Sequence, residues 1–360
     1  MAQINKPSDY FNTVTYTGDD ATPTRTITGV GFQPDLVWVK RRSNSGSHYI
    51  WDVARGTNLN IFSNHTLAEL NINTGDPNGG VSTSSSDGFT VIEGTSDIYA
   101  LNQGGETHVS WNWLGGGTAS SNTDGSITSQ VSANTTSGFS IVSYTGTGAN
   151  ATVGHGLGVA PKMVIFKNRD NGTQEWDTYH TGLTDATYFI QLNSTNAQNN
   201  TNGALRFNST APSTNYFSVG TATTTNESGN AMIAYCFAEK KGFSKFGKYT
   251  GNGSTNGTFV YTGFKPAFLI QKRTDAGSSF WSMWDSVRNT YNNVTNAVNA
   301  NVSDREYTAA DGILGFDFLS NGFKVRDTNS SRNASGGTYI YMAFAENPFV
   351  TSTGVPATAR

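Results

Sequence analysis

The feature that most constrains the fold is an internal pattern that occurs three times. Each copy contains a Tyr-Thr-Gly triplet, beginning at Tyr16, Tyr144 and Tyr249. A Gly-hydrophobic-x-Pro turn follows and leads into an apolar run that ends in lysine, reading GFQPDLVWVK, GVAPKMVIFK and GFKPAFLIQK. Copies more than about 100 residues apart are whole domains, because the repeats of solenoids are only about 20–50 residues long. The sequence therefore predicts three similar domains in one chain.

Two kinds of residue are expected to anchor each copy. The turn prolines are Pro34, Pro161 and Pro266. Proline lacks an amide hydrogen and is tolerated at the first residue of a strand, so these prolines are expected to fix where a strand begins. A Trp-Asp pair follows each apolar run, and its aspartates are Asp52, Asp177 and Asp285. We expect each aspartate to bond a turn backbone or a neighbouring lysine.

Four tryptophans allow two interpretations: Trp51, Trp176, Trp281 and Trp284. The indole of a tryptophan in a β-sandwich usually belongs to the core. The alternative is that these rings are exposed and stack on the sugar rings of a glycan.

The segments between the turns are typical of β-strands. TVTYTG, FTVIEG and YIYMAFAE are short, rich in β-branched and aromatic residues, and bounded by turn residues. Closely spaced strands predict an all-β chain of three tandem antiparallel β-sandwich domains, most simply jelly rolls. The predicted domains cover 1–114, 138–240 and 241–350. The Gly/Ser/Thr-rich stretch 115–137 is predicted to be a linker, and 351–360 a C-terminal tail.

Composition excludes several functions. The formal charge is −3 and only 14% of residues are charged, so the chain has no electrostatic footprint for nucleic acid. No apolar run approaches the roughly 20 residues that a transmembrane helix needs, which argues against membrane insertion. The N-terminus has no hydrophobic signal stretch and Cys236 is the single cysteine. We therefore expect synthesis in a reducing cytoplasm.

The common catalytic motifs are absent from the sequence. The five histidines show no His-Glu-x-x-His spacing, and neither Gly-x-Ser-x-Gly nor a P-loop occurs. Apart from the aspartate after tryptophan, no acidic residue recurs in all three copies. The chain is therefore expected not to be an enzyme and to hold no cofactor. Calcium stays open as an alternative, because the loops 73–80 and 121–126 are rich in oxygen ligands, although neither has the twelve-residue spacing of an EF-hand.

Longer phrases of the sequence carry a family resemblance. NKPSDYFNTVTYTG, GHGLGVAPKMVIFK and AYCFAEKKGFSKFGKYTG are similar to phrases of virion structural proteins of tailed phages, of the type found in marine phages and cyanophages. The resemblance covers nearly the whole chain, from about Asn5 to Val350. It implies repeated lectin-like sandwiches, of the jelly-roll or concanavalin A-like kind, displayed on the particle surface. It supplies no catalytic residues.

This resemblance leads to a set of functional expectations. The chain is expected to be a capsid decoration, head fibre or short tail-fibre component, made in the bacterial host cytoplasm and located on the virion surface. Its partners would be other virion proteins of the capsid or tail, and by analogy further copies of itself, such as a trimer. The alternative is a receptor-binding tail adhesin, or a free carbohydrate-binding module, that holds a host surface glycan through exposed Trp and Tyr.

Overall fold

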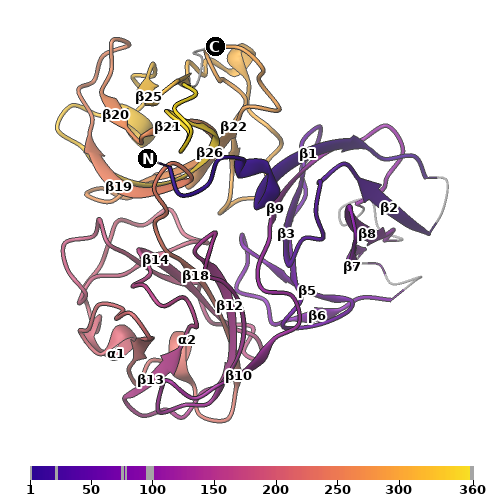
Figure 1. Ribbon diagram of the computed structural model, residues 1–360, viewed down its shortest axis with the longest axis vertical. Coiled ribbons are helices and arrows are strands. Elements are labelled where there is room, and N and C mark those ends of the chain that lie inside the picture. The colour runs from indigo at the N-terminus through magenta and orange to yellow at the C-terminus, as the bar shows by residue number, and fades with distance from the viewer. Residues whose placement is uncertain (1, 21–22, 74–76, 78, 95–100, 357–360) are drawn as a thin grey trace.

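The computed structural model describes residues 2–20, 23–73, 77, 79–94 and 101–356. It is built almost entirely of antiparallel strands, in several sheets, as the sequence predicted. Figure 1 shows three lobes around a common centre, one for each copy of the repeated pattern. No helix in the described part of the chain is long and apolar enough to cross a bilayer.

Each copy contributes one large antiparallel sheet. Sheet 1 has the order β1-β9-β3-β4-β5-β6, sheet 2 has β10-β11-β12-β18-β14-β15-β16, and sheet 3 has β19-β26-β21-β22-β23. The strands of sheet 1 are β1 (Phe11–Thr17), β3 (Leu36–Arg41), β4 (His48–Asp52), β5 (Leu59–Phe62), β6 (Leu70–Asn71) and β9 (Thr107–Trp113). Those of sheet 2 are β10 (Ser120–Asn122), β11 (Ser129–Asn134), β12 (Phe139–Thr145), β14 (Met163–Asn168), β15 (Asp177–His180), β16 (Ile190–Gln191) and β18 (Ala231–Phe237). Those of sheet 3 are β19 (Ser244–Thr250), β21 (Phe264–Arg273), β22 (Ser282–Asp285), β23 (Val298–Asn299) and β26 (Thr338–Pro348).

Three small sheets accompany the large ones, with the orders β2-β8-β7, β13-β17 and β20-β25-β24. Their strands are β2 (Thr24–Thr28), β7 (Gly80–Ser85), β8 (Gly88–Ile92), β13 (Ala151–Gly154), β17 (Tyr216–Val219), β20 (Phe259–Tyr261), β24 (Phe316–Leu319) and β25 (Gly322–Val325). The helices are single turns: η1 (Pro7–Asp9), α1 (Ala204–Phe207), α2 (Thr223–Asn226), η2 (Ala309–Asp311) and α3 (Ser330–Asn333).

The apolar runs are buried on both faces of their strands. In β3, Leu36 and Trp38 belong to one cluster, whereas Val37 and Val39 belong to another. The second cluster also contains residues of β2, β7 and β8 and is private to the first copy. The second and third copies have private clusters of the same kind. Because neighbouring side chains on a strand point to opposite faces, each large sheet buries one face in its own copy and the other elsewhere.

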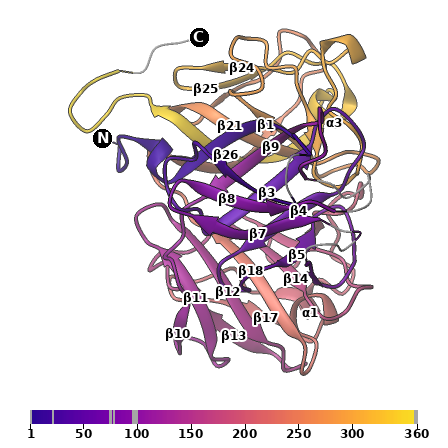
Figure 2. The same ribbon diagram turned by 90° about the vertical axis from the view of Figure 1, so that its right-hand side faces the viewer.

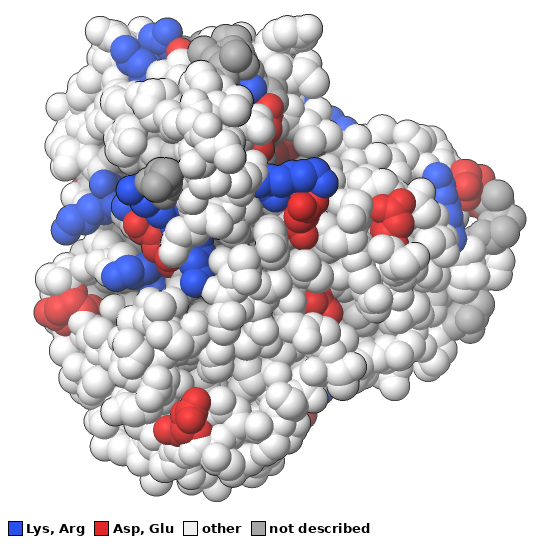
Figure 3. Space-filling view, viewed as in Figure 1, with Lys and Arg blue, Asp and Glu red and all other residues white. Residues whose placement is uncertain are grey.

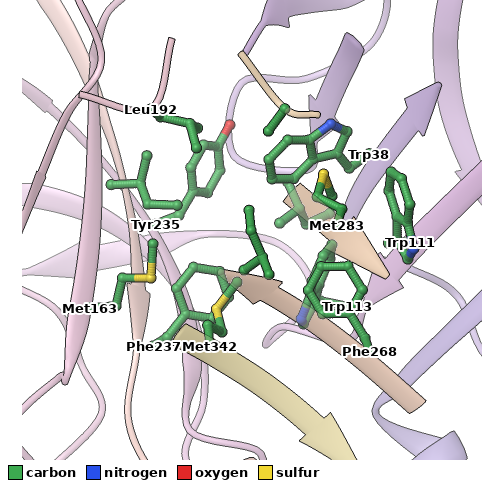
Figure 4. Packing of buried hydrophobic residues seen from close by; sticks show 14 of the residues in the cluster. Trp38, Trp111, Trp113, Met163, Leu192, Tyr235, Phe237, Phe268, Met283 and Met342 are labelled. Atoms are coloured by element: carbon green, nitrogen blue, oxygen red, sulfur yellow. The ribbon is translucent and has the colours of Figure 1, made fainter. Parts of the chain in front are cut away.

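The other faces of the three large sheets meet in one shared cluster at the centre of the molecule. Trp113, Phe237 and Phe344 lie at equivalent places in β9, β18 and β26, and their ring centroids are 5.8–6.2 Å apart in all three pairings. Figure 4 shows residues of this shared cluster converging from the three sheets. The three copies are therefore joined around a common core and do not form a string of independent units.

The stretch 115–137, predicted to be a linker, instead contains β10 and β11. β11 pairs with β12, and Val131 lies opposite Val142. Ile127 and Val131 join the private cluster of the second copy. The linker prediction was wrong because the Ser/Thr/Asn composition hid two inward-facing aliphatic residues, which suffice to hold a segment against an existing sheet.

The repeated Tyr-Thr-Gly triplet fixes a close approach of two chain segments. The Tyr16 hydroxyl donates to the Leu101 carbonyl, and Tyr249 donates to the Arg332 carbonyl in the same way. A Cβ on Gly18 would lie 2.0 Å from the Gln103 carbonyl oxygen, so no other residue fits there. The triplet recurs because each copy needs this contact.

The repeated prolines lie at or near the start of a buried strand. Pro34 and Pro161 are buried and come two residues before β3 and β14. Pro266 lies inside β21, where the pairing with β26 shifts register. A bulge is one of the few strand positions that proline tolerates.

The first and last described segments of the chain, around Asn5 and Ser352, lie on the same side of the molecule (Figure 2). Asn5 donates to the Ser352 hydroxyl and accepts from the Ser352 amide. The Gln3 amide donates to the Lys241 carbonyl, at the junction between the second and third copies. The N-terminal segment thereby connects the first copy to the start of the third copy and to the segment that follows it.

Candidate functional site

The four candidate tryptophans are all buried. Trp51 is 2% exposed, Trp176 and Trp284 are 0%, and Trp281 is 1%. Three of the indoles donate to backbone carbonyls: Trp51 to Gly56, Trp176 to His65 and Trp281 to Gln191. Trp284 packs against Phe316. The exposed stacking surface suggested for these rings is therefore not present, since each side chain completes the core.

The three aspartates are also buried, but they are not equivalent. The residue four places before the run's lysine pairs with Asp52 in sheet 1, with His180 in sheet 2 and with Asp285 in sheet 3. Asp177 lies at a different position, and it accepts from Arg206 and Thr224 of its own copy. The sequence prediction that the three Trp-Asp pairs correspond was wrong for the second copy, where a similar dipeptide occurs three residues earlier in the strand.

Asp52 is part of a buried charge network between sheets 1 and 2. It pairs with Arg55, whose side chain also pairs with Glu69. Glu69 continues to Arg169 of the second copy, 2.7 Å away, and the Tyr235 hydroxyl of that copy donates to Asp52 at 2.7 Å. As expected from the sequence, the aspartate also binds a turn backbone, the amide of Arg55.

The interface between sheets 3 and 1 repeats the Asp, Arg, Glu and Arg of this network at equivalent positions, with a tryptophan in the place of Tyr235. Asp285 pairs with Arg288, and Arg288 pairs with Glu306. Glu306 reaches Arg42 of the first copy at 2.8 Å, and the Trp111 indole donates to Asp285 at 3.1 Å.

At the interface between sheets 2 and 3, neutral residues occupy the four positions of this network, and we call it the neutral interface for that reason. His180 takes the place of the aspartate and bonds the Tyr341 carbonyl at 3.0 Å. Leu183 occupies the position of the arginines and packs in the shared cluster. Gln198 and Thr274 stand where the other interfaces have glutamate and arginine, and they keep the backbone bond from Gln198 N to Thr274 O.

The lysines that end the three apolar runs each bind a neighbouring copy, so that one such lysine crosses each of the three interfaces. Lys40 donates to Ser303 of the third copy, Lys167 to Thr66 of the first and Lys272 to Thr195 of the second, in each case to a backbone carbonyl. Burial lowers the pKa of Lys40 and Lys272 to about 7 and that of Lys167 to about 8. In the sequence these lysines mark only the end of each apolar run. A lysine recurs at the end of each apolar run, and this recurrence could have predicted that the lysines are buried and structural.

The two loops considered for calcium contain no cluster of metal ligands among their described residues. Part of 73–80 lies outside the described residues, at 74–76 and 78. In 121–126, Asp124 accepts from the Asn122 side chain within an ordinary turn. Among the residues that the structure describes, no group of three or more His, Cys, Asp or Glu side chains could hold a metal ion.

The third copy has exposed aromatic residues at the edge of its small sheet. Phe259 and Tyr261 of β20 are 46% and 59% exposed. Beside them lies a cavity of about 370 Å³, lined by Tyr261, Phe349 and the lysines Lys241 and Lys245, among others. We call β19, β20 and this cavity the edge surface. It is a candidate binding site that the sequence did not single out, because the sequence does not show that Phe259 and Tyr261 are exposed.

Comparison with known proteins gives a family but no described function. No curated protein and no solved structure matches the chain. A family model described as a domain of unknown function, DUF7483, matches residues 6–348, which span all three copies of the pattern. The chain belongs to this DUF7483 family.

Proposed function

We propose that this chain is a non-enzymatic structural protein of a phage virion, displayed on the particle surface as a capsid decoration, head fibre or short tail-fibre component. In this proposal the three copies are tandem lectin-like β-sandwiches, each formed by a large sheet and the small sheet that shares its private cluster. The support from sequence is the resemblance of phrases along nearly the whole chain to virion proteins of tailed phages.

The observation that carries the proposal is the shared core. Three copies whose large sheets bury one face together form a single rigid unit, and the charged residues of the networks around Asp52 and Asp285 join its copies from within. A rigid surface with few free charges suits a protein packed at high local concentration beside other virion proteins. One chain already has the arrangement that a trimer of single-copy chains would have. Formation of a further homotrimer stays a prediction.

The second candidate, a glycan-binding adhesin, depends on exposed aromatic side chains. The buried tryptophans no longer support it, but Tyr261 does, because an exposed ring on an edge strand can stack on a sugar. Replacing Trp281 with alanine is expected to destabilise the fold, whereas replacing Tyr261 with alanine tests glycan binding without that loss.

Immunogold labelling of intact particles from the source lysate, with an antibody to the purified chain, tests the proposal. Gold spread over heads supports a decoration or head-fibre role, and gold confined to tails supports a tail-fibre role. Absence of gold from particles, with the antibody still detecting the chain in the same lysate, would reject the virion assignment.

A further inference from the structure

The second copy shows how a strand edge in this fold is covered. On the side away from β18, β12 pairs with β11. The amide of Ile127, which precedes β11, donates to the Thr152 carbonyl of β13 at 2.9 Å. The Ser129 hydroxyl donates to the Gly154 carbonyl at 3.0 Å. The segment 120–134 therefore closes the large and the small sheet of this copy along one side.

No strand of the described part of the chain covers the equivalent side of the third copy. β19 lies at the end of sheet 3 and β20 at the end of its small sheet, without a further strand neighbour among the described residues. In an antiparallel pair, alternate residues direct their N–H and C=O groups away from the partner strand, so β19 presents a row of backbone groups at this edge.

Two residues of β13, which is covered, are smaller than those at the equivalent positions of β20, whose edge no described strand covers. Val153 faces Phe217 and Val260 faces Phe323, which makes Thr152 and Gly154 the counterparts of Phe259 and Tyr261. A Cβ on Gly154 would lie 1.7 Å from the Asn122 side chain, so the covering segment leaves no room there. The third copy places two exposed aromatic rings in the same position. In the first copy the counterparts are Thr26 and Thr28.

Charge also distinguishes the edge surface. Lys241 and Lys248 are exposed, and the described residues offer neither of them an ion-pair partner. Lys245 is paired with Glu239. In Figure 3, Lys and Arg side chains gather where Figure 1 labels β19. The equivalent strand of the first copy, β1, contains no lysine.

We propose that the edge surface binds an extended, acidic segment of a partner protein, which adds to sheet 3 beside β19 as β11 adds to β12. Backbone bonds to β19 would provide the affinity, as in other cases of strand addition. An apolar side chain would enter the cavity beside Tyr261 and Phe349, and carboxylates would face Lys241 and Lys248. The lysines oppose pairing with basic or identical edges, so the same residues prevent self-association and select the partner.

The chain itself supplies the probe for a test. A fluorescent peptide of residues 118–136 carries the covering segment, and Gln130 in it faces Ser143, the counterpart of Lys248. With Gln130→Glu, the peptide would place a carboxylate opposite Lys248, and with Gln130→Lys it would place a repelling charge there. Binding to the full-length protein is measured by fluorescence anisotropy, and the bound region by hydrogen exchange.

We expect the Gln130→Glu peptide to bind and to slow amide exchange in β19. Lys248→Glu in the protein should weaken this peptide about fivefold and favour the Gln130→Lys peptide, because an attractive cross-strand pair becomes repulsive. The matched control is Thr15→Glu, at the same position in β1, which should leave binding unchanged.

Three results would overturn the proposal. The first is peptide binding that is equal in the wild type and Lys248→Glu, or exchange protection outside β19 and β20. The second is a glycan that binds the protein and is lost in Tyr261→Ala when neither peptide binds. The third is a dimer in sedimentation that Lys248→Glu dissociates, which would make a second copy the occupant. None of these results depends on whether the chain is found on virions.

Discussion

The interface between sheets 2 and 3 joins two copies through neutral residues at the four positions where the other two interfaces have a charge network. At two interfaces an aspartate, an arginine and a glutamate continue to an arginine of the neighbouring copy. At the third, their places are taken by His180, Leu183, Gln198 and Thr274.

The features shared by all three interfaces indicate what the arrangement requires. Glu69, Gln198 and Glu306 each donate a backbone amide to the neighbouring copy, to the carbonyls of Arg169, Thr274 and Arg42. The shared apolar cluster and the lysine–carbonyl bonds are common to the three as well. Backbone bonds and apolar packing therefore define the geometry. A buried ion pair adds little net stability, but each member depends on the other once both are buried.

The largest effect is expected from removing a buried arginine. Arg55→Met leaves Asp52 without its charged partner in a site where both side chains are 0% exposed. The free energy of unfolding should fall by about 3–5 kcal/mol in chemical denaturation. The matched control is Leu183→Met at the neutral interface, where a swap of similar volume should cost less than about 1.5 kcal/mol. Equal losses in the two variants would mean that the charge network does not matter.

Acid should weaken the interface between sheets 2 and 3 through His180. Burial lowers the pKa of His180 to about 4, from about 6.5 in the unfolded chain. Between these values the unfolded state binds more protons than the folded state, so stability falls as the pH is lowered from about 6.5 to about 4. His180 should account for up to about 3 kcal/mol of this loss. His180→Gln should show a correspondingly smaller loss across the same range in denaturation at each pH. An unchanged pH dependence would contradict this origin.

The sequence predicted the class of fold but not how the copies meet. Period-two strands and turn residues are local signals, so the all-β prediction was confirmed. The runs LVWV, MVIF and FLI are apolar at consecutive positions, which indicates burial on both faces. That pattern carried the signal for a shared core. It does not specify which surface covers the second face, because the partner lies in another copy more than 100 residues away.

The candidate site shows a second limit of sequence reasoning. Trp and Tyr were both considered for stacking on sugars, but only burial separates Trp281, at 1% exposed, from Tyr261, at 59%. Burial in turn depends on whether an edge is covered, as by residues 120–134 in the second copy. The non-equivalence of Asp177 was hidden for a similar reason, since only the strand register reveals that His180 is the counterpart of Asp52.

A smaller effect is expected where the charge network reaches the surface. Arg169→Thr gives the interface between sheets 1 and 2 the residue found at the neutral interface. The Arg169 side chain is 15% exposed and Glu69 retains Arg55, so no carboxylate is left unpaired. We expect a loss of about 1 kcal/mol at low salt, decreasing with added salt. A loss as large as that of Arg55→Met would show that the network acts as one indivisible unit.

The reverse exchange tests whether charge can be added to the neutral interface. Thr274→Arg together with Gln198→Glu places an ion pair where the backbone bond from Gln198 to Thr274 already brings the two chains together. The Gln198 side-chain oxygen accepts from the Thr184 amide, and a glutamate can keep that bond. Thr274 is 1% exposed and Gln198 is partly exposed. Because the cost of burying part of the new charges offsets most of their attraction, we expect a gain of only about 0.5 kcal/mol, present at low salt and absent near 1 M. Each single variant should lack this salt-dependent gain. A double variant that is less stable than both singles would mean that the neutral interface cannot accept the network, and that the difference between the interfaces is fixed by packing around Leu183.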